Sequence, residues 1–293
     1  MRVFVTGATG FIGSAVVQNL MRDGHQVVGL ARSDASAAAL AALGVEAHRG
    51  DITDPDSLVA VARASDGVIH TAFVHDFSNF AANVEIDRLV LEALVGALRG
   101  SGKPLVIASG TLMVSHARPA TEKDAPLSND MPRAASEAMV LAPENGLRGS
   151  VVRLAPAVHD LTRAGLVSML VDQARAKGVS PYVGEGRNLW PAVHRLDAAR
   201  LFNLALERAE PGTRLHAAAE ELSSRAIAEA IGEALGVPVR SIAPEDAPAH
   251  FETIAAFVGL DNPTSSALTR QTFGWRPEGN DLLADIRESR GFQ

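Results

Sequence analysis

The sequence predicts an α/β fold in which a doubly wound parallel sheet carries a smaller C-terminal lobe. Two observations support this prediction. Short apolar runs alternate with helix-length stretches rich in alanine and leucine, and a glycine-rich turn directly follows the first apolar run. Such alternation is typical of βαβ units, whose parallel sheet is covered by helices on both faces.

The apolar runs of the first half are predicted to be buried strands. Each is short, rich in valine, isoleucine or leucine, and followed by a turn or a helical segment. They are RVFV at 2–5, QVVGL at 26–30, GVEAHR at 44–49, GVIHTAF at 67–73, PLVIAS at 104–109 and SVVRLAP at 150–156. Residues 1–155 are therefore expected to form the domain that contains the sheet.

The pattern loosens after about Leu154, and residues 156–293 are expected to form mainly a smaller lobe, with 193–217 returning to the first domain. Within the lobe, EELSSRAIAEAIGEALG has the features of a capped amphipathic helix. The tail through GWRPEG mixes short helices with proline-bearing turns. We expect the lobe at the carboxyl edge of the sheet, where open α/β sheets bind their ligands.

Three glycines stand where the first strand turns into the first helix. Gly7, Gly10 and Gly13 form a GxxGxxG pattern within TGATGFIG. Bare backbone lets a pyrophosphate approach the amides of the helix N-terminus, and the third glycine lets the helix pack closely on the sheet. The pattern predicts a Rossmann-type dinucleotide site, although a tight turn without a ligand is the alternative. The other residues of the turn expected to contact the cofactor are Thr9, Phe11 and Ile12.

The ends of the second and third strands bear on the choice of cofactor. NAD-binding folds place an acid after the second strand, whereas GLARSD has Arg32 and Ser33 there. Because a guanidinium suits a 2′-phosphate, NADP(H) is favoured over NAD(H). In the alternative, Arg32 is a solvated surface residue and Asp34 takes the role of the acid. GDITD then places Asp51 and Ile52 beside the expected adenine site, where Asp51 can equally be a helix cap.

Composition excludes several classes of partner. The net charge is -7 and there is no run of lysine or arginine, so a nucleic acid is not expected. No run of 18 apolar residues is present, so no membrane span is expected. The chain has no cysteine, which excludes disulfides and thiolate chemistry and fits a cytoplasmic protein. We expect a small-molecule substrate and no metal site.

Several motifs together resemble the extended and atypical short-chain dehydrogenase/reductase superfamily over nearly the whole chain. They are TGATGFIG, GDITD, VIHTAF, VVRLAPAV, WPAVHRLDAARLFNLALE and GWRP. The resemblance implies a Rossmann domain that binds NAD(P) and a C-terminal lobe that covers the substrate. It also implies a homodimer through helices at 83–98 and 133–141. The residues that it places along the cofactor are Thr71, Ala72 and Phe73, with Pro156 to Val158 at the nicotinamide end.

The chain departs from that superfamily at its catalytic motif. The superfamily normally uses a YxxxK pair, but the only tyrosine is Tyr182, which VGEG follows. Counting back from SEAMV, which resembles the segment beyond the family lysine, places Arg133 at the lysine position and Asn129 at the tyrosine position. One atypical subgroup has HxxxR there. Neither Asn129 nor Arg133 is a good acid near neutral pH, but Arg133 can polarise a carbonyl or merely start a helix.

Reduction of a ketone also needs a proton, for which histidine is the natural source. His75, in the loop after the fourth strand, is one candidate, and His194 is the other, although a structural role is the alternative for both. His70 lies inside an apolar strand and is expected in the core. Ser109 and Thr111 follow the fifth strand, where a hydroxyl can stabilise a substrate oxygen or simply a turn.

Tyr182 and Trp190, in PYVGEGRNLW, are expected at the lobe interface as walls of a substrate pocket or as packing anchors, and His194 is placed with them. The sequence thus predicts an NADP(H)-dependent oxidoreductase that acts on a small carbonyl or alcohol. Two alternatives remain, namely a non-catalytic NADP(H)-binding sensor, because both halves of YxxxK are missing, and a sugar-nucleotide epimerase or dehydratase.

Overall fold

A computed structural model gives the structure of the protein and describes residues 1–74, 79–114, 118–128, 133–162 and 165–288. Within these residues, seven parallel strands form the central sheet in the order β10-β6-β5-β4-β1-β2-β3. The strands are β1 (Arg2–Thr6), β2 (Gln26–Ala31), β3 (Glu46–Arg49), β4 (Gly67–His70), β5 (Pro104–Gly110), β6 (Arg148–Leu154) and β10 (Thr213–Ala217). The doubly wound sheet and the strands expected in the first half are confirmed.

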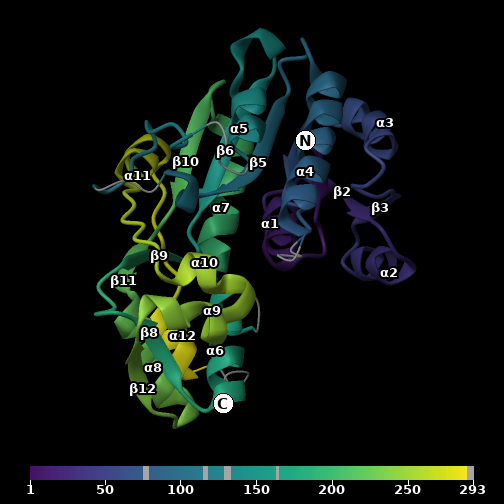
Figure 1. Cartoon of the computed structure of the whole chain (residues 1–293). Coiled ribbons are helices and arrows are strands. Elements are labelled where there is room, and N and C mark those ends of the chain that lie inside the picture. The colour runs from purple at the N-terminus through teal and green to yellow at the C-terminus, as the bar shows by residue number, and fades with distance from the viewer. Residues whose placement is uncertain (75–78, 115–117, 129–132, 163–164, 289–293) are drawn as a thin grey trace.

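Both faces of the sheet are covered by helices because its strands alternate apolar side chains toward two cores. Val3 and Val5 pack with α1, α2 and α7, whereas Phe4 packs on the opposite face with α3, α4 and α5. These helices are α1 (Phe11–Arg22), α2 (Asp34–Ala42), α7 (Arg195–Arg208), α3 (Asp56–Ala64), α4 (Phe80–Leu98) and α5 (Ala134–Leu141). Figure 1 shows α4 and α5 beside the sheet, with α3 next to α4.

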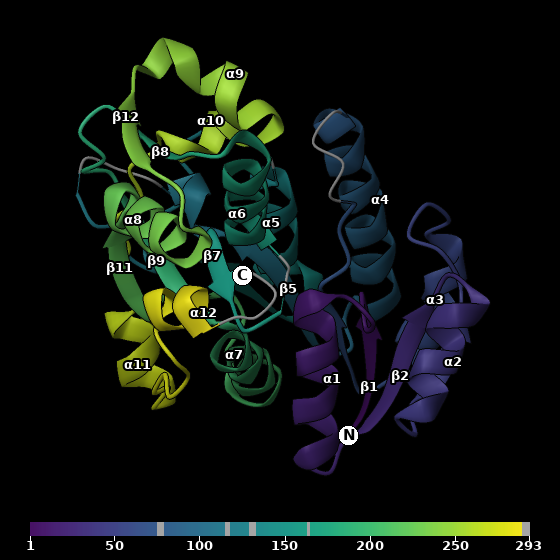
Figure 2. The same cartoon turned by 90° about the horizontal axis from the view of Figure 1, so that it is seen from below.

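The second half of the chain builds a smaller lobe around two short sheets. Among the described residues, these sheets have the orders β11-β9-β7 and β12-β8. Their strands are β7 (Ala157–His159), β8 (Ser180–Val183), β9 (Leu189–His194), β11 (Glu220–Ser223) and β12 (Val239–Ile242). The helices here are α6 (Gly165–Lys177), α8 (Ser224–Leu235), α9 (Ala247–Phe251), α10 (Ala255–Val258) and α12 (Leu282–Glu288). Figure 2 shows α6, α8, α9 and α12 grouped to one side of α1 and β1.

The capped helix expected in the lobe is α8. The side chain of Ser223 accepts a hydrogen bond from the amide of Ala226, and Gly236 ends the helix with a φ of 66°. The described residues also include short 3-10 helices, η2 (Thr111–Val114), η3 (Pro143–Asn145), η4 (Pro244–Asp246) and η5 (Glu252–Ile254).

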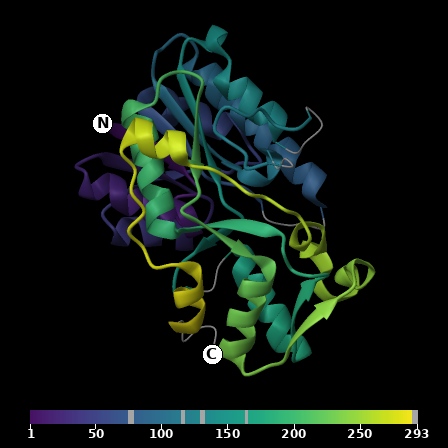
Figure 3. The ribbon, with the colours of Figure 1, turned by 90° about the vertical axis from the view of Figure 1, so that its left-hand side faces the viewer.

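Two segments that follow the lobe strands return to the central sheet. The helix α7 packs along α1, and β10 pairs with β6 as the edge strand. The helix α11 (Ala267–Phe273) then contacts β10. Figure 3 shows the purple and blue central-sheet segments above and the lobe below. No helix in the described residues is long and apolar enough to cross a membrane.

Candidate functional site

The turn between β1 and α1 has the geometry that a pyrophosphate requires. Gly7 has a φ of 68°, which favours glycine, and a Cβ on Gly13 would lie 2.0 Å from the carbonyl oxygen of Gly7. The helix begins at Phe11 with no side-chain cap at Gly10 and no acidic residue in its first turn. The first helical amides are therefore available to an anion, and the residues present fit a dinucleotide. Thr9 and Gly10 are exposed, whereas Phe11 and Ile12 are half-buried.

The end of β4 closes one side of this turn. The hydroxyl of Thr71 donates to the carbonyl oxygen of Thr6 at 2.8 Å, and the amide of Ala72 donates to the hydroxyl of Thr6 at 3.4 Å. Thr71, Ala72 and Phe73 are half-buried. The sequence-predicted cofactor residues of β1 and β4 are thus brought together at one edge of the sheet.

Two arginines stand at the ends of β2 and β3. Arg32 is exposed and has no hydrogen-bond or ion-pair partner among the described residues. Arg49, which sequence reasoning missed, pairs in register with Ala31 and forms an ion pair with Asp34 at 3.2 Å. The hydroxyl of Ser33 already caps α2 by accepting from the amide of Ser36. Two positively charged side chains, Arg32 and Arg49, therefore lie at this edge of the sheet.

The segment after β3 contains the two residues expected beside the adenine. Asp51 is half-buried, and its Oδ1 accepts from the amide and the hydroxyl of Thr53 at 2.9 and 3.0 Å. Ile52 is partly buried against the core that covers α3 and α4. The carboxylate of Asp51 therefore stabilises the turn from Asp51 to Thr53, and Ile52 provides an apolar surface next to it.

Arg133 lies where the ends of β4 and β5 meet. Its Nε donates to Asp87 Oδ2 at 3.3 Å, and its Nη2 donates to Asp87 Oδ1 at 3.1 Å and to the carbonyl oxygen of Ala108 at 2.6 Å. Its Cζ lies 4.9 Å from the ring centroid of Phe73. Within the described residues, no acceptor faces Nη1, so the guanidinium is held at one edge and available at the other.

The backbone of Arg133 is also unusual, because a φ of 65° places a non-glycine residue in the left-handed region directly before α5. Such a conformation costs about 1 kcal/mol or more and persists only where its surroundings hold it. The hydrogen bonds to Asp87 and Ala108 supply that support.

Asp87, on α4, is the buried anion that holds Arg133, and sequence reasoning missed it. Its two oxygens also accept from Ser136 Oγ at 2.9 Å and contact His70 Nε2 at 3.2 Å. Burial raises the pKa of this carboxyl, but Arg133, His70 and Ser136 together outweigh burial and lower the pKa from 3.8 to about 2. Asp87 is therefore ionised at neutral pH.

His70 extends this network to the dinucleotide turn. It is 1% exposed, as its expected place in the core requires, and its Nδ1 lies 2.7 Å from Thr6 Oγ1. An ionised carboxylate only accepts hydrogen bonds, so Nε2 must carry a proton toward Asp87. In the neutral ring, Nδ1 then accepts from the hydroxyl of Thr6. A continuous set of contacts thus joins Thr6, His70, Asp87 and Arg133.

The two hydroxyls at the end of β5, those of Ser109 within the strand and Thr111 just after it, have different surroundings. Thr111 is fully buried, donates to Asn262 Oδ1 at 2.7 Å, and accepts at its carbonyl oxygen from Asn262 Nδ2 at 3.0 Å. Ser109 is also buried, and among the described residues its hydroxyl has one partner, the sulfur of Met113 at 4.0 Å. It directly follows Ala108, the acceptor of Arg133. Ser109 is therefore better placed than Thr111 to meet a substrate oxygen. His75 and Asn129 lie outside the described residues.

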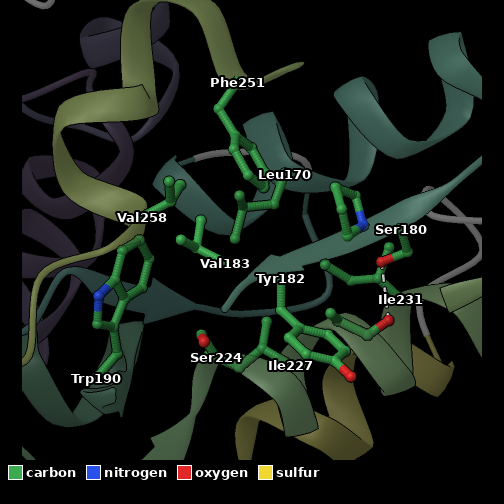
Figure 4. Close-up of a pocket in the computed structure, with 12 residues that line it drawn as sticks. Leu170, Ser180, Tyr182, Val183, Trp190, Ser224, Ile227, Ile231, Phe251 and Val258 are labelled. Atoms are coloured by element: carbon green, nitrogen blue, oxygen red, sulfur yellow. Dashed lines mark hydrogen bonds between the residues drawn. The ribbon is translucent and has the colours of Figure 1, made fainter. Parts of the chain in front are cut away.

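Tyr182 and Trp190 line the same apolar pocket of the lobe. Figure 4 shows Leu170, Val183 and Val258 directed into the space between Phe251 and Trp190, with Tyr182 beside Ile227. Three polar side chains of the lining are paired within the protein, because Trp190 Nε1 donates to Leu260 O, Ser180 Oγ donates to Ala228 O and Ser224 Oγ donates to Asn188 Oδ1. The described lining residues carry no charge.

The remaining residues of the expected site lie elsewhere. His194 does not line this pocket. Its Nδ1 accepts from the amide of Leu196 at the start of α7, and its ring occupies the space where Gly279 has no side chain. Pro156 is half-buried after β6, and Val158 is buried against the central core. In the described residues, no group of three or more ligating side chains is arranged to hold a metal ion.

The chain matches known proteins over its full length. The family model described as NAD dependent epimerase/dehydratase family matches residues 3–218. The chain is 44% identical, over 295 residues and 100% of both chains, to an uncharacterized protein of Schizosaccharomyces pombe. It is 26% identical to the 2-alkyl-3-oxoalkanoate reductase of Stenotrophomonas maltophilia, over 81% of this chain and 77% of that one.

Solved structures share the fold. A dTDP-glucose 4,6-dehydratase from Streptomyces venezuelae with NAD bound aligns with a TM-score of 0.78 at 24% identity, over 100% of this chain and 98% of the other. A UDP-glucose 4-epimerase from Thermus thermophilus, in complex with NAD, aligns with a TM-score of 0.76 at 23% identity, over 100% of this chain and 99% of the other. The Rossmann-type arrangement expected from the glycine motif is confirmed.

Proposed function

Because the chain belongs to the NAD dependent epimerase/dehydratase family, we propose that it is an NADP(H)-dependent oxidoreductase of a small carbonyl or alcohol substrate. The observation that carries this proposal is the guanidinium of Arg133. Asp87 and Ala108 hold one edge of it next to Ser109, and among the described residues its Nη1 has no acceptor. The exposed Arg32 supports the preference for a 2′-phosphate.

Each residue of the site has a separate task in the proposed reduction. Arg133 Nη1 and the hydroxyl of Ser109 donate to the substrate oxygen and stabilise the negative charge that develops on it. When bound, the nicotinamide supplies a hydride to the carbonyl carbon. The proton that completes the alcohol comes from His75 or from a water molecule, because Arg133 keeps its own proton at neutral pH.

The lobe pocket suits only a small apolar part of a carbonyl substrate, because its volume is about 30 Å³. Its described lining is mainly aliphatic and aromatic, and the polar atoms of Trp190, Ser180 and Ser224 are already paired. One relative is named 2-alkyl-3-oxoalkanoate reductase, which agrees with such a substrate. A nucleoside diphosphate, in contrast, needs cations. The described lining of this pocket has none, whereas the adjoining cleft that shares Tyr182 is lined by Arg187 and Arg225.

The test follows NADPH consumption with ethyl acetoacetate, 4-nitrobenzaldehyde and UDP-glucose as probes. We expect one of the two carbonyl probes to oxidise NADPH. Arg133→Met should then lower kcat about 100-fold, the usual cost of removing a donor to a developing oxyanion. The dissociation constant of NADPH should change little. The control Arg88→Met removes an exposed arginine of α4 that pairs with Glu85, and it should keep full activity.

Three results would contradict this proposal. Full activity in Arg133→Met removes the residue from the chemistry. Tight NADPH binding without turnover of any probe supports a non-catalytic sensor instead. Conversion of UDP-glucose without net NADPH oxidation supports an epimerase.

A further inference from the structure

A second arginine, which none of the steps above uses, lies beside the dinucleotide turn. Arg195 is the first residue of α7, and its Cζ lies 5.2 Å from the ring centroid of Phe11, the first residue of α1. Since α1 and α7 pack along each other, this placement is fixed by two long helices. Figure 2 shows the two helices as neighbours.

The guanidinium of Arg195 has only part of the partners that a buried cation needs. Its Nη1 forms an ion pair with Asp160 Oδ2 at 3.0 Å, and its side chain is 17% exposed. Its Nε is closed off from solvent and has no hydrogen-bond partner among the described residues. Leaving a buried N–H donor without an acceptor costs free energy. The Nε of Arg195 therefore needs an acceptor that the described residues do not supply.

The charges around Arg195 also favour an anion. The N-terminus of α1 carries partial positive charge and has no acidic residue in its first turn. Arg195 adds a full positive charge at the N-terminus of α7, where a cation is disfavoured. Asp197, in the same turn of α7, is already occupied by the amides of Glu278 and Gly279. Within the described residues, Asp160 is therefore the carboxylate that pairs with the Arg195 guanidinium.

We propose that Arg195 binds the diphosphate of the dinucleotide, opposite the amides of the α1 turn. This inference rests on the dinucleotide site of the proposed function. The guanidinium lies over the ring of Phe11, the first helical residue after the turn, and this contact keeps it near the turn. Because NADPH and NADH share the diphosphate, Arg195 contributes equally to both, whereas Arg32 contributes to NADPH alone. The substrate lobe is thereby tied to the cofactor, since Asp160 follows β7.

The experiment measures binding by calorimetry, so it needs no substrate. Arg195→Met should raise the dissociation constants of NADPH and NADH by the same factor, about tenfold or more for a lost charge-assisted contact. The affinity for adenosine 2′-monophosphate, which lacks the 5′-diphosphate, should stay unchanged. The matched control is Arg208→Met, since Arg208 lies on the same helix with its Cζ 5.7 Å from the ring centroid of Phe273. It should bind both dinucleotides as the wild type does.

A second variant covers the case in which Arg195→Met fails to fold. Arg195→Lys keeps the charge but loses the planar fork and the stacking, so both affinities should fall severalfold. Wild-type affinity in the folded Arg195 variants overturns the inference, and so does a loss confined to NADPH. If the wild-type protein binds neither dinucleotide, the proposed function fails together with this inference. If the wild type binds both and the Arg195 variants bind them equally well, the inference fails alone.

Discussion

Arg133 and Arg153 are both held by buried carboxylates near α5, but within the described residues only Arg133 has a guanidinium nitrogen without an acceptor. Arg153, on β6, is fully buried. Its Nε and Nη2 donate to Glu137, and its Nη1 donates to the carbonyl oxygen of Asp124. Arg133 is 16% exposed at its side chain, and among the described residues its Nη1 has no acceptor.

This difference separates an ion pair that supports the fold from the one that we propose acts on a substrate. A guanidinium whose donors are all committed can only stabilise the fold, whereas one that is gripped along a single edge presents a fixed donor to a ligand. The helix α5 serves both, because Ser136 donates to Asp87 and the next residue, Glu137, receives Arg153. The Arg133–Asp87 and Arg153–Glu137 pairs are therefore neighbours, but we expect substitution of Arg133 to affect mainly activity and substitution of Arg153 mainly stability.

The largest expected effect is on stability. Arg153→Met leaves the carboxylate of Glu137 buried without its main partner, which should cost about 3–5 kcal/mol of the free energy of unfolding. Arg133→Met should cost less, because His70 and Ser136 still contact Asp87. Urea unfolding of both variants measures the difference. Equal losses would mean that the two arginines do not differ in the way that their contacts indicate.

The next largest expected effect is on how the free energy of unfolding changes at acidic pH. The pKa of Asp87 is lowered from 3.8 to about 2, so its ionised form adds about 2 kcal/mol at neutral pH. This contribution is present above the unfolded-state pKa and is lost as the pH falls from about 5 to about 2. Unfolding free energies measured along this range should fall more steeply in the wild type than in Asp87→Asn. Parallel curves would show that Asp87 is not the titrating group.

The dinucleotide turn could be predicted from the sequence because its geometry is local. Gly7 and Gly10 are three residues apart, and the amide of Gly10 donates to the carbonyl oxygen of Gly7 at 2.8 Å. The spacing of the glycines therefore predicts the conformation of the turn. The positive φ of Gly7 and the close packing of Gly13 follow from the same motif.

The contacts of Arg133 and Thr111 could be predicted only in part, because their partners are distant in the sequence. Arg133 can be found through its place in the motif, but Asp87 is 46 residues away and Asn262 is 151 residues from Thr111. No local pattern links such pairs. One signal was present, since Asp87 lies on the same face of α4 as the buried Val90, Leu91 and Leu94. A carboxylate on an apolar face needs a buried partner.

The short strands of the lobe escaped the sequence analysis for a different reason. β8 and β12 are four residues each and pair only with each other. Their apolar pattern is too short to distinguish a strand from a turn. The pocket among β8, α6 and α8 could therefore be expected from Tyr182 and Trp190, but its other walls could not.

The smallest expected effect extends the comparison to the two exposed arginines of the ribose side. Arg32 has no partner among the described residues, whereas Arg49 is already paired with Asp34. Arg32→Ala should therefore weaken NADPH about tenfold, the value of one charge-assisted contact to a phosphate, and leave NADH unchanged. Arg49→Ala should weaken NADPH only about threefold, because Asp34 offsets its charge and solvent screens an exposed pair.

The measurement is a titration of each variant with NADPH and NADH, with Asp34→Asn as the matched control. Removing the carboxylate frees Arg49, so Asp34→Asn should bind NADPH more tightly and leave NADH unchanged. If Asp34→Asn instead weakens NADH, then Asp34 holds the ribose hydroxyls, and the preference for a 2′-phosphate is lost. Equal losses of both cofactors in Arg32→Ala would remove Arg32 from the 2′-phosphate site. Either result would mean that, at the ends of β2 and β3, an arginine without a protein partner does not by that fact bind the cofactor.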